Sequence, residues 1–310
     1  MDRLKLHAHR NIEKVYSGIN DLPSGSAPEG IIEGCAVLEG GAFRGVYGEG
    51  VLDALMQNGI NMSCTIGVSA GAMNGLNYVA SDIGRSARIN LRYRHDRRYV
   101  GLRAIHDNHG LIGFDFAFKQ LQSIDPLNME RFFDPARRFI AVATDCATGL
   151  PAYFEKGKCS DIFKAVQASA SMPYVSAMVD IDGGKYLDGG CSKKVPYEWA
   201  ISEGYEKIVI VRTQPLSYRK SGEVDKKARL FYRTHPEFAK SLSISGIEYN
   251  RECDEMESLS KAGRVFMISP SRPIEASNME SDMEKLGGLY HMGYDDAINA
   301  MGALKRYLGI

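Results

Sequence analysis

The run Gly67-Val68-Ser69-Ala70-Gly71 places one serine between two glycines. Residues 62–66 ahead of it are typical of a short strand, and residues 70–80 after it carry apolar side chains at helical spacing. In such a tight strand-to-helix turn the serine hydroxyl projects outward, and Gly67 and Gly71 leave room for the adjoining backbone. The pattern predicts that Ser69 is a nucleophile that attacks a carbonyl carbon.

A second glycine-containing turn lies upstream, between a predicted strand at residues 35–38 and a predicted helix at residues 46–58. Attack on a carbonyl creates a negative oxygen, and backbone N–H groups at the start of a helix are suited to stabilise it. The candidate donors of this oxyanion hole are Gly40, Gly41, Ala42, Phe43, Arg44 and Gly45, together with Ala70 from the serine turn. A nucleotide-phosphate loop is the alternative, but neither G-x-G-x-x-G nor G-x-x-x-x-G-K-[ST] is present.

The serine needs a proton acceptor, and two Asp-Gly-Gly sequences offer one at Asp182 and at Asp188. Asp182 lies between two short apolar stretches, which is the pattern of a hairpin turn. Asp188 instead ends the second stretch, where its carboxylate can project from the sheet edge, and Gly189 and Gly190 allow close approach of the backbone. We therefore predict that Asp188 accepts the proton of Ser69 and that Asp182 is structural.

These motifs give the chain a resemblance to the patatin-like phospholipases of bacteria. The resemblance covers residues 34–211, where the glycine-rich turn, the serine turn and the Asp188 motif stand in the family's order, with an alanine- and serine-rich run at 168–173. It implies a three-layer α/β/α fold with a mostly parallel central sheet, a Ser69–Asp188 dyad, no cofactor or metal, and hydrolysis of carboxylic esters of lipids. Ala42 departs from the family pattern, which usually has a third glycine there, so its N–H serves only if Ala42 adopts the required φ.

A dyad requires a carboxylate more basic than a free aspartate, whose pKa is about 3.9. Our hypothesis is that partial burial raises the pKa of Asp188 and that a short hydrogen bond links it to Ser69. A histidine is the alternative base, and only His235 and His291 follow Asp188 in the Ser, Asp, His order. Both fall at or within predicted helices, so we expect them to be surface or packing residues.

The order of the predicted elements, strands alternating with helices, is typical of a parallel sheet covered on both faces. Later strands are predicted at residues 139–144, 207–212 and 265–268, helices at 236–262 and 289–308, and loops bordering the site at 108–128 and 213–225. We expect an N-terminal extension at residues 1–33, a catalytic core at 34–212, and a C-terminal helical region at 213–310 packed on the core.

Composition excludes other classes of protein. The 310 residues are 44% hydrophobic with a formal net charge of zero, which permits a large core but argues against a nucleic-acid binder. The six cysteines stand singly, without a C-x-x-C pair, so neither a zinc site nor a disulfide framework is indicated. Because no apolar run approaches the ~20 residues of a membrane span and the start lacks the apolar core of a signal peptide, we expect a cytoplasmic protein.

An arginine-rich stretch bears on contact with membranes. Its members are Arg85, Arg88, Arg92, Arg94, Arg97, Arg98 and Arg103, opposed by the single acid Asp96. A solvated helix face is one interpretation, and peripheral contact with anionic lipid headgroups is the other, each basic residue contributing about 1 kcal/mol. The motifs also fit a lipid transacylase or a non-catalytic lipid-binding protein, and they leave acyl chain length, headgroup and oligomeric state open.

Overall fold

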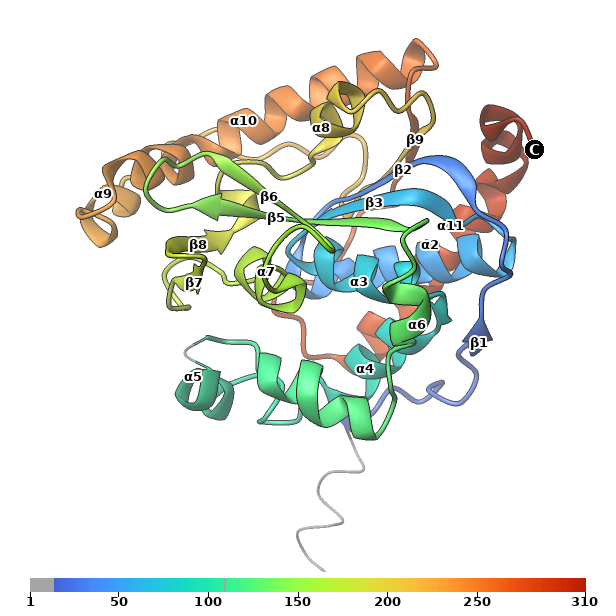
Figure 1. Ribbon diagram of the computed structural model, residues 1–310, viewed down its shortest axis with the longest axis horizontal. Coiled ribbons are helices and arrows are strands. Elements are labelled where there is room, and N and C mark those ends of the chain that lie inside the picture. The colour runs from blue at the N-terminus through green and yellow to red at the C-terminus, as the bar shows by residue number, and fades with distance from the viewer. Residues whose placement is uncertain (1–13, 109) are drawn as a thin grey trace, which may run out of the picture.

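A central β-sheet covered by helices on both faces organises the computed structural model, which describes residues 14–108 and 110–310 (Figure 1). The strands are β1 (Gly25–Ser26), β2 (Ile32–Leu38), β3 (Met62–Val68), β4 (Asp82–Ile83), β5 (Arg138–Asp145), β6 (Pro151–Glu155), β7 (Val179–Ile181), β8 (Gly184–Asp188), β9 (Ile208–Val211) and β10 (Phe266–Ile268). In the described residues the main sheet has eight strands in the order β10-β9-β2-β3-β5-β8-β7, with β6 paired to β5. The strands from β10 to β5 are parallel, whereas β6, β7 and β8 pair antiparallel.

The helices follow the strands in the alternation that the sequence predicts. The α-helices are α2 (Val46–Gln57), α3 (Ala70–Val79), α4 (Arg85–Tyr93), α5 (Leu102–Asn108), α6 (Met129–Phe132), α7 (Ile162–Ser169), α8 (Tyr197–Ser202), α9 (Lys227–Phe231), α10 (Pro236–Lys261) and α11 (Met283–Leu308). Short 3₁₀ turns are η2 (Ala42–Gly45), η4 (Leu121–Ser123) and η5 (Gly189–Cys191), and η3 (Phe116–Gln120) is a π-helical turn. The parallel strands therefore feed helices at one edge of the sheet, where the site is expected.

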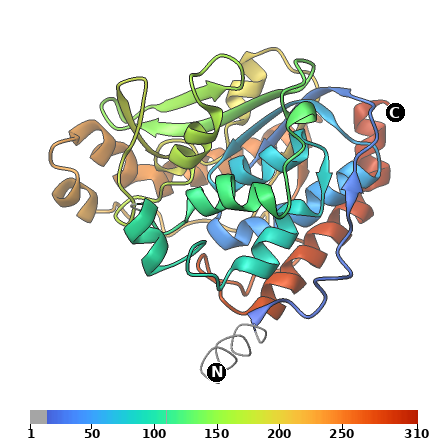
Figure 2. The ribbon, with the colours of Figure 1, turned by 60° about the horizontal axis from the view of Figure 1, so that its bottom comes forward.

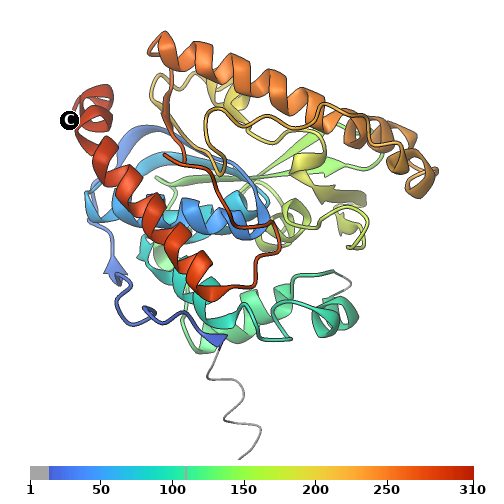
Figure 3. The same ribbon diagram turned by 180° about the vertical axis from the view of Figure 1, so that it is seen from behind.

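The two faces of the sheet are covered by different helices, as Figures 1 and 3 show. In β2, Ala36 and Leu38 belong to the core that contains α2 and α11, whereas Cys35 and Val37 belong to the core that contains α8 and α10. The alternation arises because successive residues of a strand face opposite sides. β9 is buried along its whole length, as expected for a strand covered on both faces. The predicted three-layer α/β/α architecture with a mostly parallel sheet is confirmed.

The last helix, α11, packs lengthwise against α2 (Figure 3). Two glycines permit the close approach of these helices. A Cβ at Gly50 would lie 2.0 Å from the Tyr290 carbonyl oxygen, and one at Gly293 would lie 1.9 Å from the Tyr47 carbonyl oxygen. The backbones of the two helices therefore touch at positions where any side chain would separate them.

The beginning of α11 differs from the sequence prediction. Its glycines oppose helix formation, so the sequence predicts a start only at residue 289, whereas the helix begins at Met283. The Asp282 carboxylate caps it by accepting hydrogen bonds from the backbone N–H groups of Glu284 and Lys285. Gly287 leaves space for the Tyr16 ring, whose nearest atom would be 2.1 Å from an added Cβ. The glycine therefore serves packing rather than ending the helix.

Residues 108–128 are helical in part, contrary to the predicted loop. The segment contains η3 and η4, and Phe114, Phe116 and Leu121 are buried in it. These side chains pack inward, and the segment forms an outer layer with α4 and α5 below α3, a side that Figure 2 brings forward. By contrast, the predicted loop at 213–225 is irregular, with neither helix nor strand between β9 and α9.

Two of the seven cations of the arginine-rich stretch do not lie on the surface, and peripheral contact with anionic lipid stays a prediction for the others. Arg85 and Arg94 are buried. Arg94 donates to the backbone carbonyls of Met279 and Glu280, so its charge serves the packing of a distant loop. The members that remain exposed are Arg92, Arg97 and Arg103.

No helix in residues 14–108 and 110–310 combines the length and the apolar character needed to cross a bilayer. Of the N-terminal extension that the sequence predicts at 1–33, residues 1–13 lie outside the described part. Within the remainder, β1 pairs antiparallel with β4 and so ties this segment to the end of α3.

Candidate active site

Ser69 occupies a strained turn between β3 and α3. Its backbone has φ 55° and ψ −122°, a conformation that residues with a side chain rarely adopt. The flanking glycines are required by space, because a Cβ at Gly67 would lie 2.5 Å from the Gly71 carbonyl oxygen and one at Gly71 would lie 2.4 Å from the Leu38 carbonyl oxygen. The turn therefore has the geometry expected of a nucleophile elbow.

The side chains of Ser69 and Asp188 meet although they lie far apart in the sequence. Ser69 Oγ donates a hydrogen bond of 2.7 Å to Asp188 Oδ2, and each residue is only 8% exposed. The other carboxylate oxygen, Oδ1, accepts from the Gly190 N–H at 2.7 Å. Asp182 is instead exposed in the β7–β8 hairpin with φ 51°. Of the two candidate carboxylates, the structure thus brings only Asp188 to the serine.

The alanine- and serine-rich run supports both members of this pair. Ser169 Oγ accepts from the Ser69 N–H at 2.8 Å and donates to the Val142 carbonyl at 2.6 Å. The Ser171 carbonyl accepts from the Asp188 N–H at 2.9 Å. Ser169 and Ser171 therefore hold Ser69 and Asp188 in place relative to each other, a role that the sequence alone did not assign to individual serines.

Burial raises the pKa of Asp188 above that of a free aspartate. The hydrogen bonds from Ser69 and Gly190, and the positive charges of Lys194 and Lys220, oppose this effect without cancelling it. A carboxylate with a raised pKa is a stronger base and accepts a serine proton more readily. The electrostatic condition for a serine–aspartate dyad is therefore present.

The glycine-rich turn lies beside Ser69, and its N–H groups divide into two sets. Those of Phe43 and Arg44 donate to the carbonyls of Asn278 and Gly41, so these two predicted donors are engaged elsewhere. Within the described chain no acceptor is bonded to the N–H groups of Gly41 and Ala42. Ala42 has φ 50°, so it adopts the left-handed backbone conformation although it is not a glycine.

Three further predicted positions shape the same corner. A Cβ at Gly40 would lie 3.0 Å from the Ser69 Cβ, and one at Gly45 would lie 2.7 Å from the Ala70 Cβ. Ala70 is the first residue of α3, so its N–H is free of the helix hydrogen bonds and is available as a donor. With Phe43 and Arg44 set aside, the predicted oxyanion donors Gly40, Gly41, Ala42, Gly45 and Ala70 remain candidates.

A buried network that the sequence did not suggest fixes the glycine-rich turn. Glu39 Oε2 accepts from the Thr213 N–H at 2.7 Å, and Oε1 accepts from the Tyr249 hydroxyl at 2.6 Å. Thr213 Oγ1 in turn donates to the Gly40 carbonyl at 2.6 Å, and the fully buried Arg212 lies 3.8 Å from Glu39. The turn is thus tied to β9 and to α10, a connection between residues too far apart in sequence to predict.

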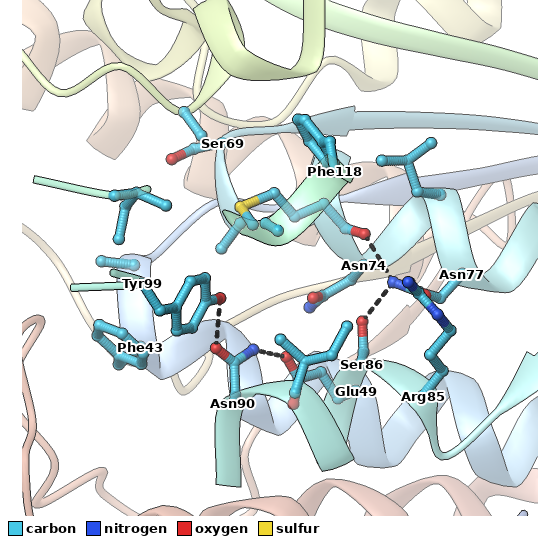
Figure 4. Close-up of a pocket in the computed structure, with 18 of the residues that line it drawn as sticks. Phe43, Glu49, Ser69, Asn74, Asn77, Arg85, Ser86, Asn90, Tyr99 and Phe118 are labelled. Carbon is cyan, nitrogen blue, oxygen red and sulfur yellow. Dashed lines mark hydrogen bonds between the residues drawn. The ribbon is translucent and has the colours of Figure 1, made fainter. Parts of the chain in front are cut away.

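Two pockets meet at Ser69. The first is a cavity of about 80 Å³ that runs along α3. Its apolar wall includes Met73, Leu76, Phe118 and Phe163, and its lining continues to several polar residues at the end remote from Ser69 (Figure 4). We call this the α3 cavity.

The second, which we call the basic pocket, opens on the other side of the dyad and is lined by Arg44, Lys194 and Lys220. Within the described residues none of these cations forms an ion pair with a carboxylate. Lys194 Nζ donates to the carbonyls of Gly190 and Ser245, and Arg44 is placed to donate to the side-chain oxygen of Gln214. Burial, together with the charges of Lys194 and Arg44, lowers the pKa of Lys220 to about 8. The pocket is suited to a negatively charged group.

The histidine alternative finds no support in the geometry. His235 caps α10 and contacts the Thr234 hydroxyl at 3.0 Å, and His291 contacts the Tyr16 hydroxyl at 3.0 Å. Neither residue lines the α3 cavity or the basic pocket. Among the described residues, no group of three or more His, Cys, Asp or Glu side chains is placed to hold a metal ion.

Comparison with known proteins shows the family. A model of the family "Patatin-like phospholipase" matches residues 36–201, more than half of the chain, and the chain therefore belongs to the patatin-like phospholipase family. Proteins of this family are generally hydrolases that act on lipid esters. A second model, "Domain of unknown function (DUF6363)", matches residues 235–309.

Individual relatives are less informative. The chain is similar to the uncharacterized protein YjjU of Escherichia coli (strain K12), with 30% identity over 184 residues that cover 58% of this chain and 51% of that protein. The match thus spans about half the length of this curated relative. Among solved structures it is similar to VipD from Legionella pneumophila, with a TM-score of 0.47 and 15% identity over 91% of this chain and 68% of that one.

Proposed function

We propose that this protein is a lipid acyl hydrolase that cleaves carboxylic esters through an acyl-enzyme on Ser69. The observation that carries the proposal is the 2.7 Å hydrogen bond from Ser69 Oγ to a buried Asp188 carboxylate at the junction of two pockets. Free N–H groups of Gly41 and Ala42 beside it supply the further element that acyl transfer needs.

The reaction proceeds in two halves on this dyad. Ser69 Oγ attacks the ester carbonyl carbon while its proton passes to Asp188, and backbone N–H groups of the glycine-rich turn and Ala70 stabilise the negative oxygen. Collapse of the intermediate breaks the bond to the alcohol, which leaves with the proton held by Asp188. Asp188 then takes a proton from water as the water attacks the acyl carbon; the bond from that carbon to Ser69 Oγ breaks, the proton on Asp188 returns to Oγ, and the fatty acid leaves.

The two pockets suggest how the substrate lies. The apolar wall of the α3 cavity suits an acyl chain, because apolar surface is stabilised when it leaves water. The basic pocket suits the alcohol part of an ester that carries a negative charge, such as the phosphate of a phospholipid or lysophospholipid. A phospholipase or lysophospholipase is therefore favoured over an esterase of neutral alcohols.

Labelling with a fluorophosphonate probe, followed by peptide mapping, tests the nucleophile. We expect one modified serine, Ser69, and no labelling in Ser69→Ala. An active protein without label at Ser69, or label retained in the variant, would contradict the mechanism. An unreactive Ser69 in folded protein would favour the non-catalytic lipid-binding alternative.

Product analysis decides what accepts the acyl group. With a lysophospholipid in water, hydrolysis gives free fatty acid, whereas a transacylase gives a new ester when an alcohol such as glycerol is supplied. We expect free fatty acid as the main product with and without glycerol. Predominant ester formation would assign the same dyad to acyl transfer.

A further inference from the structure

The end of the α3 cavity remote from Ser69 is polar, which is unusual for a site that holds a hydrocarbon chain. Glu49 from α2, Arg85, Ser86 and Asn90 from α4, and Asn77 from α3 line it. Figure 4 shows Ser69 at one end of the cavity and this group at the other. We call these residues the polar floor.

Most of the hydrogen bonds in the polar floor hold helices together. Asn90 Nδ2 donates to Glu49 Oε1, and Asn90 Oδ1 accepts from the Tyr99 hydroxyl at 2.8 Å. Arg85 Nη1 donates to Asn77 Oδ1 at 2.7 Å, and Arg85 Nε donates to the Asp125 carbonyl at 2.9 Å. The network joins α2, α3 and α4 and accounts for the positions of these side chains.

Two buried polar atoms of the polar floor have no hydrogen-bond partner in this network. Glu49 is 2% exposed and Arg85 is 5% exposed, and no described residue forms a hydrogen bond with Glu49 Oε2 or Arg85 Nη2. A buried polar atom without a partner costs on the order of 1–3 kcal/mol, so such atoms usually serve a ligand or a function. The two residues, Glu49 and Arg85, both line the cavity that begins at Ser69.

From these observations we infer that the α3 cavity selects acyl groups that carry a hydroxyl group on the distal part of the chain. The inference rests on the proposed function, since it places the acyl chain between Ser69 and the polar floor. Asn77 lies eight residues beyond Ser69, so at 1.5 Å of rise per residue the floor is about 12 Å along α3 from the nucleophile. A hydroxyl at that distance both donates and accepts, whereas a plain methyl end leaves the buried polar atoms as they are.

The protonation state of Glu49 is consistent with binding of a hydroxyl group at the polar floor. Burial raises the pKa of Glu49 to about 8; the hydrogen bond from Asn90 opposes this rise, and the charge of Asp53 adds a smaller one. The carboxyl group is then largely neutral at pH 7 and its free oxygen can donate a hydrogen bond. Together with the guanidinium of Arg85, it offers donors to an oxygen on the acyl chain.

Matched substrates test the inference. We would compare kcat/KM for p-nitrophenyl octanoate, decanoate and dodecanoate with the same esters bearing a terminal hydroxyl. We expect the hydroxylated ester to be preferred by about tenfold at the length that reaches the floor, and little preference for shorter chains. Equal values for each pair across the series would overturn the inference.

Substitution of Glu49 links any preference to the floor. Glu49→Leu should abolish or reverse the preference, and Glu49→Gln, which keeps the shape and the donors, should retain part of it. A preference unchanged in Glu49→Leu would also overturn the inference. Because each ratio compares two substrates on one protein, partial loss of folded enzyme does not affect it, and if Glu49→Leu fails to fold the wild-type series decides.

Failure of the proposed function would look different. In that case p-nitrophenyl butyrate, too short to reach the polar floor, would not be hydrolysed either, and Ser69 would not react with the fluorophosphonate. Hydrolysis of butyrate without a preference among long chains would sink only the inference about the polar floor.

Discussion

The two pockets that meet at Ser69 differ in the charged groups that line them and in how those groups are paired. In the basic pocket, Arg44, Lys194 and Lys220 are without carboxylate partners among the described residues, so positive charge is left for a ligand. In the α3 cavity the guanidinium of Arg85 is held by Asn77 and the Asp125 carbonyl, and apolar side chains form the wall nearer Ser69. Glu39 and Asp188 also line the basic pocket, but they form no ion pair with these cations. On the proposed function, this arrangement allows the alcohol and acyl parts of an ester to be recognised independently.

The largest expected effect comes from the residue that both pockets share. Ser69→Ala removes the nucleophile, so we expect kcat/KM to fall by about 10⁴-fold or more for every ester, whatever its acyl chain or alcohol. Initial rates with p-nitrophenyl butyrate and with a lysophospholipid measure this. Ser202→Ala, at the exposed end of α8, is the control and should keep full activity. If Ser69→Ala retained activity on either substrate, the two pockets would not share a catalytic centre.

A smaller loss is expected when the base is changed. Asp188→Asn keeps the size of the side chain but cannot take up a proton, and we expect kcat to fall about a thousandfold with little change in KM. Asp182→Asn in the exposed hairpin is the matched control. In the wild type, ionisation of Asp188 should give kcat/KM an acid limb at a pH above the pKa of a free aspartate, because burial raises the pKa of this group. Comparable losses in both variants would indicate a structural effect of the Asp-Gly-Gly turns.

Lys220 should distinguish the basic pocket from the α3 cavity. Lys220→Met should lower kcat/KM about tenfold for monooleoylglycerol phosphate and leave monooleoylglycerol nearly unchanged, since only the phosphate uses the charge. Lys185→Met, on an exposed position of β8, is the control. Equal losses on both substrates would show that the pocket does not recognise an anionic alcohol.

The same pair of substrates gives a pH dependence. The pKa of Lys220 is about 8, and the side chain is charged below this value, so the preference for the phosphate ester should be full at pH 7 and decline as the pH rises through 8. The other charged groups near Lys220 are Lys194, Arg44, Glu39 and Asp188. In Lys220→Arg the charge persists at higher pH, because arginine stays protonated, and the decline should disappear. A decline of the same size in that variant would assign it to another group.

The smallest effect is expected outside both pockets, on the surface. Arg92, Arg97 and Arg103 are the exposed members of the arginine-rich stretch, and each can contribute about 1 kcal/mol to binding of an anionic membrane. Arg92→Gln with Arg97→Gln should therefore reduce sedimentation with phosphatidylserine vesicles in a salt-dependent way while leaving kcat on dispersed esters unchanged. Arg229→Gln on α9 is the control. Binding that is unaffected by the double change or by salt would exclude this surface.

A residue of the site can be recognised from the sequence when the residues that define its role lie close to it along the chain. The turn around Ser69 is recognisable because Gly67 is required by a contact with the backbone of nearby Gly71, although Gly71 itself is required by the backbone of the distant Leu38. The choice of Asp188 over Asp182 follows from the position of Asp182 in a hairpin. The pairing of Ser69 with Asp188 also follows from the family resemblance. Lys220 and Glu39, in contrast, acquire their roles from residues that only the fold brings near, and nothing in their neighbourhood in the sequence marks them.

The expectations that the structure changes also depend on contacts between residues far apart in the sequence. The arginine-rich stretch resembles a charged surface because sequence shows charge but not burial, and Arg94 is covered by residues 279 and 280 from the far end of the chain. Gly287 near the start of α11 contacts the Tyr16 ring, which lies more than 250 positions away in the sequence, so its role cannot be recognised locally. The segment 108–128 lacks regular spacing of apolar residues, and its short turns become helical by packing against the molecule rather than by their own preference.

The contact between α2 and α11 has a consequence for how the family match and the whole chain are related. The segment matched by the patatin-like model ends at residue 201. Within that segment, α2 follows the glycine-rich turn and supplies Glu49. It packs against α11, a helix outside the segment that begins at Met283. Because Gly50 and Gly293 let the two backbones touch, a residue with a side chain at either position would displace α2 and the glycine-rich turn that precedes it. On the proposed function, α11 thus acts as a brace for the reaction centre, and we expect changes of sequence in this distant helix to alter turnover.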